Sequence, residues 1–167
     1  MKQISLVFPN QLFKESPLLK LGFDIIMIED SLFFGNDKNF ELVNHINKLI
    51  FLKASMQSYK NYLEDLGNKV IYAENKDGFK TEDYLKKYVL SNYKIINIIN
   101  PHDYLITKRI NNFAEINDIN INFFNSPMFI TKCDLVKKFE DSNKKPLMAK
   151  FYENQRQSLN ILVDSNK

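Results

Sequence analysis

The sequence is poor in the residues that build several common kinds of site. Cys133 is the only cysteine among the 167 residues, so an intrachain disulfide is excluded. Tryptophan is absent, and the four glycines form neither a GxGxxG nor a P-loop pattern. A glycine-built cradle for a dinucleotide or a triphosphate is therefore not expected.

Long apolar runs are also missing, and the charge balance is mild. No run approaches the roughly 20 residues of a membrane span, and the first residues lack the apolar segment of a signal peptide. We therefore expect a cytoplasmic protein without a membrane partner. The 23 lysines and arginines against 20 acidic residues give a net charge of +3 with no basic block. A charge balance of this kind is only weak evidence for nucleic-acid binding.

Short apolar runs alternate along the chain with longer stretches of helical periodicity. Five short runs rich in β-branched and aromatic residues predict strands at 4–8, 23–29, 69–73, 95–99 and 121–124. Helical patterns lie between them, at 40–66, 82–90 and 103–117. Strands that alternate with helices indicate an α/β fold, a Rossmann-like and mainly parallel five-stranded sheet with helices on both faces.

The pattern changes after the fifth strand. Residues 126–167 contain two helical patterns, at 131–139 and 147–163, separated by a polar break. At 44% hydrophobic content the chain is long enough for one domain with a substantial core. We expect an α/β domain over residues 1–125 and a C-terminal helical extension over 126–167.

Polar side chains follow the first two predicted strands. Asn10 and Gln11 come after the first strand, and Glu29 and Asp30 after the second. Ligands bind outside the carboxyl ends of the strands in open α/β sheets, and two amides beside a carboxylate suit the edge of a heterocycle. Two structural interpretations stay open, a turn at the first strand end and a helix-capping carboxylate at the second.

Further candidates for ligand contact lie in the helical patterns. Phe33 can stack on a planar ligand, and Lys53 and Ser55 can meet a phosphate or a hydroxyl-bearing chain. Met56 accompanies them at helical spacing. The alternatives are a core phenylalanine, a solvated lysine and a core methionine.

The sequence predicts no catalytic residue and no metal site. Neither His45 nor His102 stands at metal-ligand spacing from another His, Cys or carboxylate. Cys133 has no recognisable base beside it, and no nucleophile-elbow motif occurs.

Five segments of the chain match, in order, the pattern of a known family. They are LVFPNQLF with SPLL at 6–13 and 16–19, IEDSLFF at 28–34, KLIFLKASMQSY at 48–59, GNKVIYAE at 67–74 and MAKFYENQRQSLNILVD at 148–164. Together they resemble the N-terminal domain of the photolyase-related proteins of the cryptochrome/photolyase superfamily, in the bacterial branch that includes iron-sulfur (6-4) photolyases.

The resemblance implies a chromophore-binding role for the domain. In that family the N-terminal domain holds an antenna chromophore, in several members a ribityllumazine, while FAD and a four-iron cluster belong to a helical C-terminal domain, which we expect to lie outside this sequence. The resemblance also implies which residues line the pocket. They are Asn10 and Gln11 at the first strand end, Glu29 and Asp30 at the second strand end, and Lys53, Ser55 and Met56 on the helical segment that faces them. Asn10 replaces the aspartate of the GDQ sequence found in some antenna-binding relatives.

The leading hypothesis is therefore the N-terminal α/β domain of a deoxyribodipyrimidine photolyase-related flavoprotein. It holds an antenna chromophore or docks a FAD-binding domain for light-driven DNA repair, and it is not catalytic in isolation. The FAD-binding domain is expected in the same gene product or in a separate chain, with DNA contacted only through it. The alternative hypothesis is a free-standing nucleotide-binding or signalling module of the same Rossmann-like type.

Overall fold

The chain folds into two units. The computed structural model describes residues 1–143, 145 and 147–163. Met1–Pro127 form one compact unit and Met128–Lys167 a second. The first unit contains every described strand.

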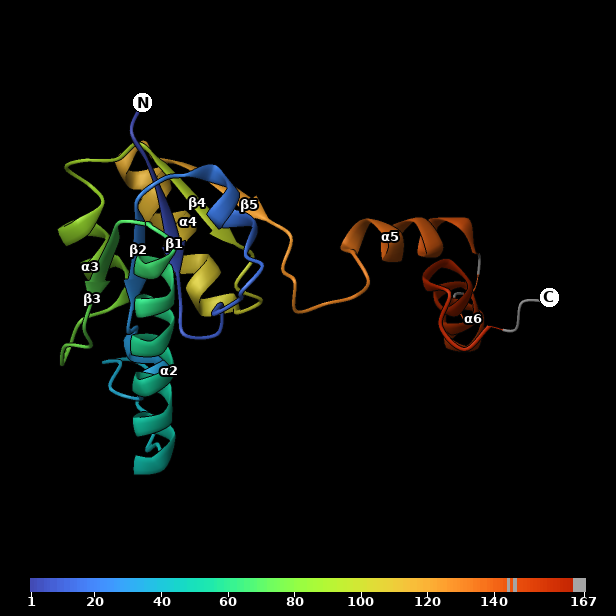
Figure 1. The fold of residues 1–167 in the computed structure, drawn as a ribbon, viewed down its shortest axis with the longest axis horizontal. Coiled ribbons are helices and arrows are strands. Elements are labelled where there is room, and N and C mark those ends of the chain that lie inside the picture. Colours follow the sequence, from blue (N-terminus) through green and yellow to red (C-terminus); the bar gives the residue numbers. More distant parts are fainter. Residues whose placement is uncertain (144, 146, 164–167) are drawn as a thin grey trace. The chain divides into compact units, whose positions relative to one another are not determined.

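A five-stranded parallel sheet forms the centre of the first unit (Figure 1). Its strands are β1 (Gln3–Val7), β2 (Ile25–Ile28), β3 (Val70–Ala73), β4 (Ile95–Ile99) and β5 (Asn120–Phe124). The order β3-β2-β1-β4-β5 confirms the predicted Rossmann-like α/β fold. The order of the strands reverses between β1 and β4, so the carboxyl ends of these two strands border the crevice where such folds bind ligands.

Helices cover both faces of the sheet, as predicted. On one face lie α2 (Ile46–Asp65) and the short 3₁₀ helix η1 (Pro17–Leu21), whose buried residues form one core with Val7, Met27 and Ile99. On the other face lie α3 (Thr81–Tyr88) and α4 (Tyr104–Asn117), which pack on a second core. The middle strands are buried on both sides, which explains their continuous apolar sequences.

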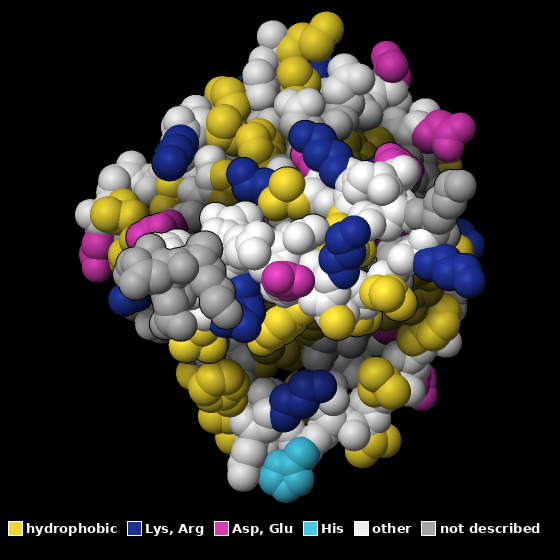
Figure 2. Space-filling view, turned by 90° about the vertical axis from the view of Figure 1, so that its right-hand side faces the viewer, with side chains coloured by type: hydrophobic (Ala, Val, Ile, Leu, Met, Phe, Trp, Pro, Cys, Tyr) yellow, Lys and Arg dark blue, Asp and Glu magenta, His cyan; other side chains and the backbone are white. Residues whose placement is uncertain are grey.

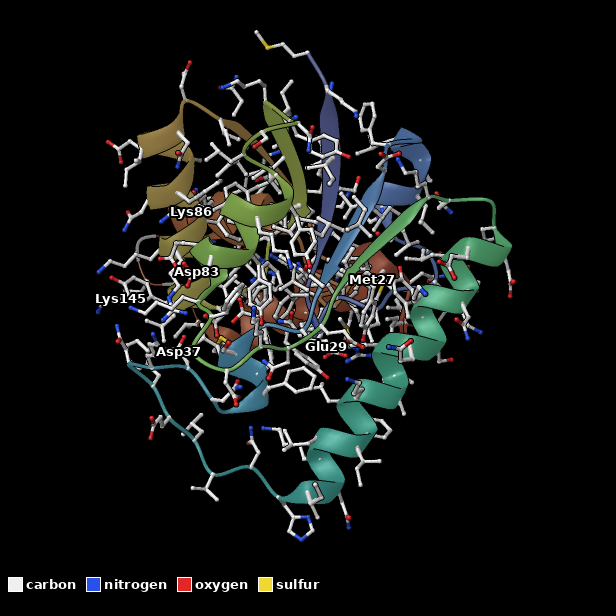
Figure 3. The ribbon with its side chains drawn as sticks, turned by 90° about the vertical axis from the view of Figure 1, so that its left-hand side faces the viewer. Met27, Glu29, Asp37, Asp83, Lys86 and Lys145 are labelled. Carbon is white, nitrogen blue, oxygen red and sulfur yellow. The ribbon has the colours of Figure 1, made fainter. Side chains whose placement is uncertain are left out.

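The segment before α2 corrects the prediction of a helix from residue 40. The helix begins at Ile46, and His45 caps it by accepting a hydrogen bond at Nδ1 from the Asn47 N–H, at 3.1 Å. A four-residue helix, α1 (Ser31–Phe34), follows β2 instead and ends at Gly35, whose φ of 85° is left-handed. The first turns of α2 project past the carboxyl ends of the strands (Figures 1 and 3).

The second unit contains two helices, α5 (Cys133–Ser142) and α6 (Met148–Leu159). The rings of Phe139 and Phe151 join them edge to face, with centroids 5.0 Å apart. Both predicted ranges need correction, because α5 continues to Ser142 and α6 ends where Asn160 adopts a left-handed conformation. Among the described residues, no helix combines the length and the apolar character that crossing a bilayer requires.

Candidate functional site

The first strand end is closed by the side chain of Gln11. Gln11 is buried, accepts a hydrogen bond at Oε1 from the Phe8 N–H at 3.1 Å, and donates from Nε2 to the Ile99 carbonyl at 2.7 Å. Asn10 donates from Nδ2 to the Pro101 carbonyl at 3.0 Å, while its buried Oδ1 has no hydrogen-bond partner in the described part of the chain. Gln11 therefore joins β1 to β4, and Asn10 keeps an unused acceptor at the crevice.

Glu29 at the second strand end is fully buried. Its carboxylate is contacted by residues of β3 and of the loop after it, and by Lys53 of α2. The Tyr72 hydroxyl donates to Oε1 at 2.5 Å and the Asn75 N–H donates to Oε2 at 2.9 Å. Lys53 Nζ of α2 lies 3.6 Å from Oε2. Burial and the bond to Glu29 raise the pKa of the Tyr72 hydroxyl. Figure 3 shows Glu29 at the carboxyl end of the sheet, between β2 and α2.

Asp30 faces the opposite side of the sheet from Lys53 and caps α1. Its Oδ1 accepts a hydrogen bond from the Leu32 N–H at 3.0 Å, which confirms the capping interpretation for this carboxylate. The side chain is fully buried, and desolvation raises its pKa from 3.8 to about 6. The Leu32 N–H and the Thr81 hydroxyl act in the opposite direction.

A buried ion pair near Asp30 was not predicted from the sequence. Arg109 of α4 holds Asp37 through two contacts, Nη1 to Oδ2 at 2.6 Å and Nη2 to Oδ1 at 3.1 Å. Asp37 is fully buried and Arg109 is 8% exposed. Burial opposes ionisation of Asp37, but the guanidinium outweighs it and lowers the pKa of this carboxyl. The pair anchors the segment between α1 and α2 to α4.

The residues predicted on α2 do not share one face. Lys53 points toward Glu29 and Glu74, and Ser55 points toward the loop after β1. Met56 is fully buried in the core and offers no surface to a ligand. The reason is helical geometry, because each residue is rotated by about 100° from the one before it, and positions i and i+2 point in nearly opposite directions.

Phe33 is used in packing. Its ring stacks on Phe8 with centroids 6.4 Å apart and lies against the second core. The structure thus brings Lys53 beside Glu29, and it places the other predicted residues in separate contacts around the carboxyl edge of the sheet rather than in one pocket.

A shallow groove lies between α2 and the loop after β1. Its volume is about 650 Å³. Tyr59 donates from its hydroxyl to the Phe13 carbonyl at 2.7 Å, and the rings of Tyr59 and Tyr62 stack at 5.8 Å. The groove is lined by Leu12, Lys14, Phe51, Ala54, Ser55, Ser58, Tyr59 and Tyr62.

The chemistry of this groove suits a planar organic molecule. Aromatic and aliphatic surface provides stacking area, and two serine hydroxyls and one ammonium group supply a few polar contacts. Its volume lies within the range of about 300–1,000 Å³ that is typical of small-molecule sites. Among the predicted residues, Ser55 alone lines it.

A second, more polar groove lies beside α3. Lys38, Asp77, Gly78, Asp83 and Lys86 contribute to its lining, and its volume is about 570 Å³. The charges that line this groove are mixed in sign, and Figure 3 labels Asp83 and Lys86 among them. Figure 2 draws a different face, on which lysine and arginine side chains are scattered among apolar ones. Within the described residues, no group of three or more His, Cys, Asp or Glu side chains is placed to hold a metal ion.

Comparison with known proteins finds a family and a relative that this chain resembles. The model of a family described as deoxyribodipyrimidine photo-lyase-related protein matches residues 5–167. An uncharacterized protein from Acanthamoeba polyphaga mimivirus is 40% identical over 177 residues, which cover 100% of this chain and 88% of that relative. The family match therefore includes both the α/β unit and the residues after it.

Proposed function

This chain belongs to the deoxyribodipyrimidine photo-lyase-related protein family, and we propose that it is the N-terminal α/β domain of a photolyase-related flavoprotein of the iron-sulfur branch. Its role is to hold an antenna chromophore and to dock against a FAD-binding domain, in the same gene product or in a separate chain. That partner carries out light-driven DNA repair and makes the contacts with DNA.

The groove along α2 is the observation that supports chromophore binding. A ribityllumazine or a flavin combines a planar ring with a polar, hydroxyl-bearing chain. The aromatic side chains of Phe51 and Tyr62 offer surface for the ring. The Ser58 hydroxyl offers a partner for the chain, and the Ser55 hydroxyl, which donates to the Phe51 carbonyl at 2.8 Å, offers an acceptor. The Lys14 ammonium group at the same groove can donate hydrogen bonds to the hydroxyl or carbonyl oxygens of such a ligand.

Fluorescence titration with a ribityllumazine, and separately with a flavin, tests this proposal. Ser58 is exposed on α2, so Ser58→Trp fills the groove without disturbing the core. This substitution is expected to weaken binding at least about tenfold. Lys53→Ala is the matched control, because Lys53 lies on the other side of the same helix, and it is expected to leave binding unchanged.

Three results would contradict the proposal in different ways. A wild-type protein that binds neither molecule has no antenna role. Binding that survives Ser58→Trp but is lost in Asn10→Ala and Lys53→Ala places the site at the strand ends. Thermal stabilisation by ATP or AMP, and by neither lumazine nor flavin, supports a nucleotide-binding module instead, because ligands that bind the native state raise its melting temperature.

A further inference from the structure

The strand β5 lies at one edge of the sheet. It is the last strand in the order and, among the strands of the described residues, pairs with β4 alone (Figure 1). The Asn120 N–H donates to the Lys94 carbonyl, and the Phe124 carbonyl accepts from the Asn100 N–H, so residues 120, 122 and 124 direct their backbone groups toward β4. Because alternate residues of a strand point to opposite sides, the N–H and C=O groups of Ile121 and Phe123 face away from the sheet.

This edge carries none of the charges that usually protect an edge strand. No charged residue occurs from Ile119 through Thr131. The opposite edge is different, because β3 is flanked by Lys69 and Glu74, which pair with Asp24 and Lys53. The ring of Phe123 is moreover 44% exposed. The β5 edge therefore has the composition of a strand that pairs with another one.

A row of side-chain amides crosses the sheet and ends at this edge. Asn97 Nδ2 donates to Gln3 Oε1 at 3.0 Å, and Asn122 Nδ2 donates to Asn97 Oδ1 at 2.9 Å. Asn122 is exposed at the outer end of the row. Since an amide is both donor and acceptor, the row can be extended by another amide placed beyond the edge.

We propose that β5 pairs antiparallel with β5 of a second copy of this chain, which joins the two sheets into one. A two-fold axis at Asn122 sets the two Asn122 residues opposite each other and Ile121 opposite Phe123 of the second copy. The outward backbone groups of Ile121 and Phe123 then meet as hydrogen-bonded pairs, and Asn122 forms the close, non-hydrogen-bonded pair between them. The contact is isologous, as in most dimers.

The same register also matches the side chains. Ile121 and Phe123 share one face of the strand, so each forms a β-branched–aromatic pair across the axis, and pairs of this kind stabilise sheets. On the other face the two Asn122 amides continue the row that begins at Gln3. The backbone hydrogen bonds, the apolar side-chain pairs and the Asn122 amides are thus all matched in the same register by a second copy of this chain.

Sedimentation of the full chain over a range of concentrations tests the proposal. Asn122→Lys places two ammonium groups opposite each other, and Asn122→Asp two carboxylates. Each variant is expected to raise the dissociation constant for self-association at least about tenfold. An equimolar mixture of the two variants is expected to form the heterodimer. Ile116→Lys, at an 81% exposed site on α4, is expected to leave self-association unchanged.

A wild-type chain that stays monomeric at every concentration would overturn the proposal, as would self-association that neither charge variant weakens. Failure of the two variants to associate when mixed would also count against the register. If Asn122→Lys does not fold, Phe123→Pro provides the same test, because it removes an outward N–H and keeps the bonds to β4. The experiment needs no chromophore, so its outcome is separate from that of the proposed function.

Discussion

Asp30→Asn is expected to stabilise the protein at neutral pH, although it removes a buried capping carboxylate. Desolvation raises the pKa of Asp30 from 3.8 to about 6 in the folded state. The folded protein therefore keeps this proton to a higher pH than the unfolded chain does. The resulting stabilisation is complete below about pH 4 and is lost as the pH rises to about 6. The difference between the two pKa values corresponds to about 3 kcal/mol of unfolding free energy.

Asparagine at this position cannot ionise and retains an oxygen that accepts from the Leu32 N–H. Urea denaturation of both proteins at about pH 4 and at about pH 7.5 measures the effect. We expect similar unfolding free energies at the lower pH and a gain of up to about 3 kcal/mol for the variant at the higher pH. A variant that is less stable than wild type at the higher pH, or a difference that does not change with pH, would contradict a raised pKa for Asp30 in the folded protein.

Three further substitutions test the packing around the carboxyl edge by chemical denaturation. Arg109→Gln leaves Asp37 buried without its charge partner and is expected to cost about 3–5 kcal/mol; a loss under 1 kcal/mol would show that water reaches the pair. Gln11→Leu leaves two backbone groups unpaired and is expected to cost about 1–3 kcal/mol per group, and unchanged stability would contradict the role given to it. Gly35→Ala would place a Cβ 2.2 Å from a backbone oxygen, whereas the Cβ of Gly67→Ala would meet no atom within 4 Å. Gly35→Ala is therefore expected to lower the unfolding free energy more than Gly67→Ala does. Equal losses would mean that only the backbone strain at positive φ matters.

The fold could be predicted from the sequence because its three middle strands are buried on both faces. Such strands give short continuous apolar runs, and β4 has the predicted bounds of 95–99. The start of α2 could not be predicted in the same way. Leu42 and Val43 continue the apolar pattern although both are exposed, at 60% and 107%, and α1 is too short to show a helical period.

The site was harder to predict because it depends on which way each side chain points and on which distant residues meet in the fold. Lys53 and Ser55 lie two positions apart in the chain, yet the helix turns them to opposite sides. Arg109 and Asp37 are 72 positions apart, and only the completed fold brings them together. One local indication existed, an arginine on the apolar face of the predicted helix at 103–117, since a buried charge requires a partner.

Chemical-shift mapping of the backbone amides during titration with a ribityllumazine locates the binding site. Shifts are expected to be concentrated at Leu12, Ser55 and Ser58, which line the groove along α2. Saturating ligand that leaves these amides unmoved, or that shifts those of Lys38 and Gly78 beside α3 instead, would contradict a binding site in this groove.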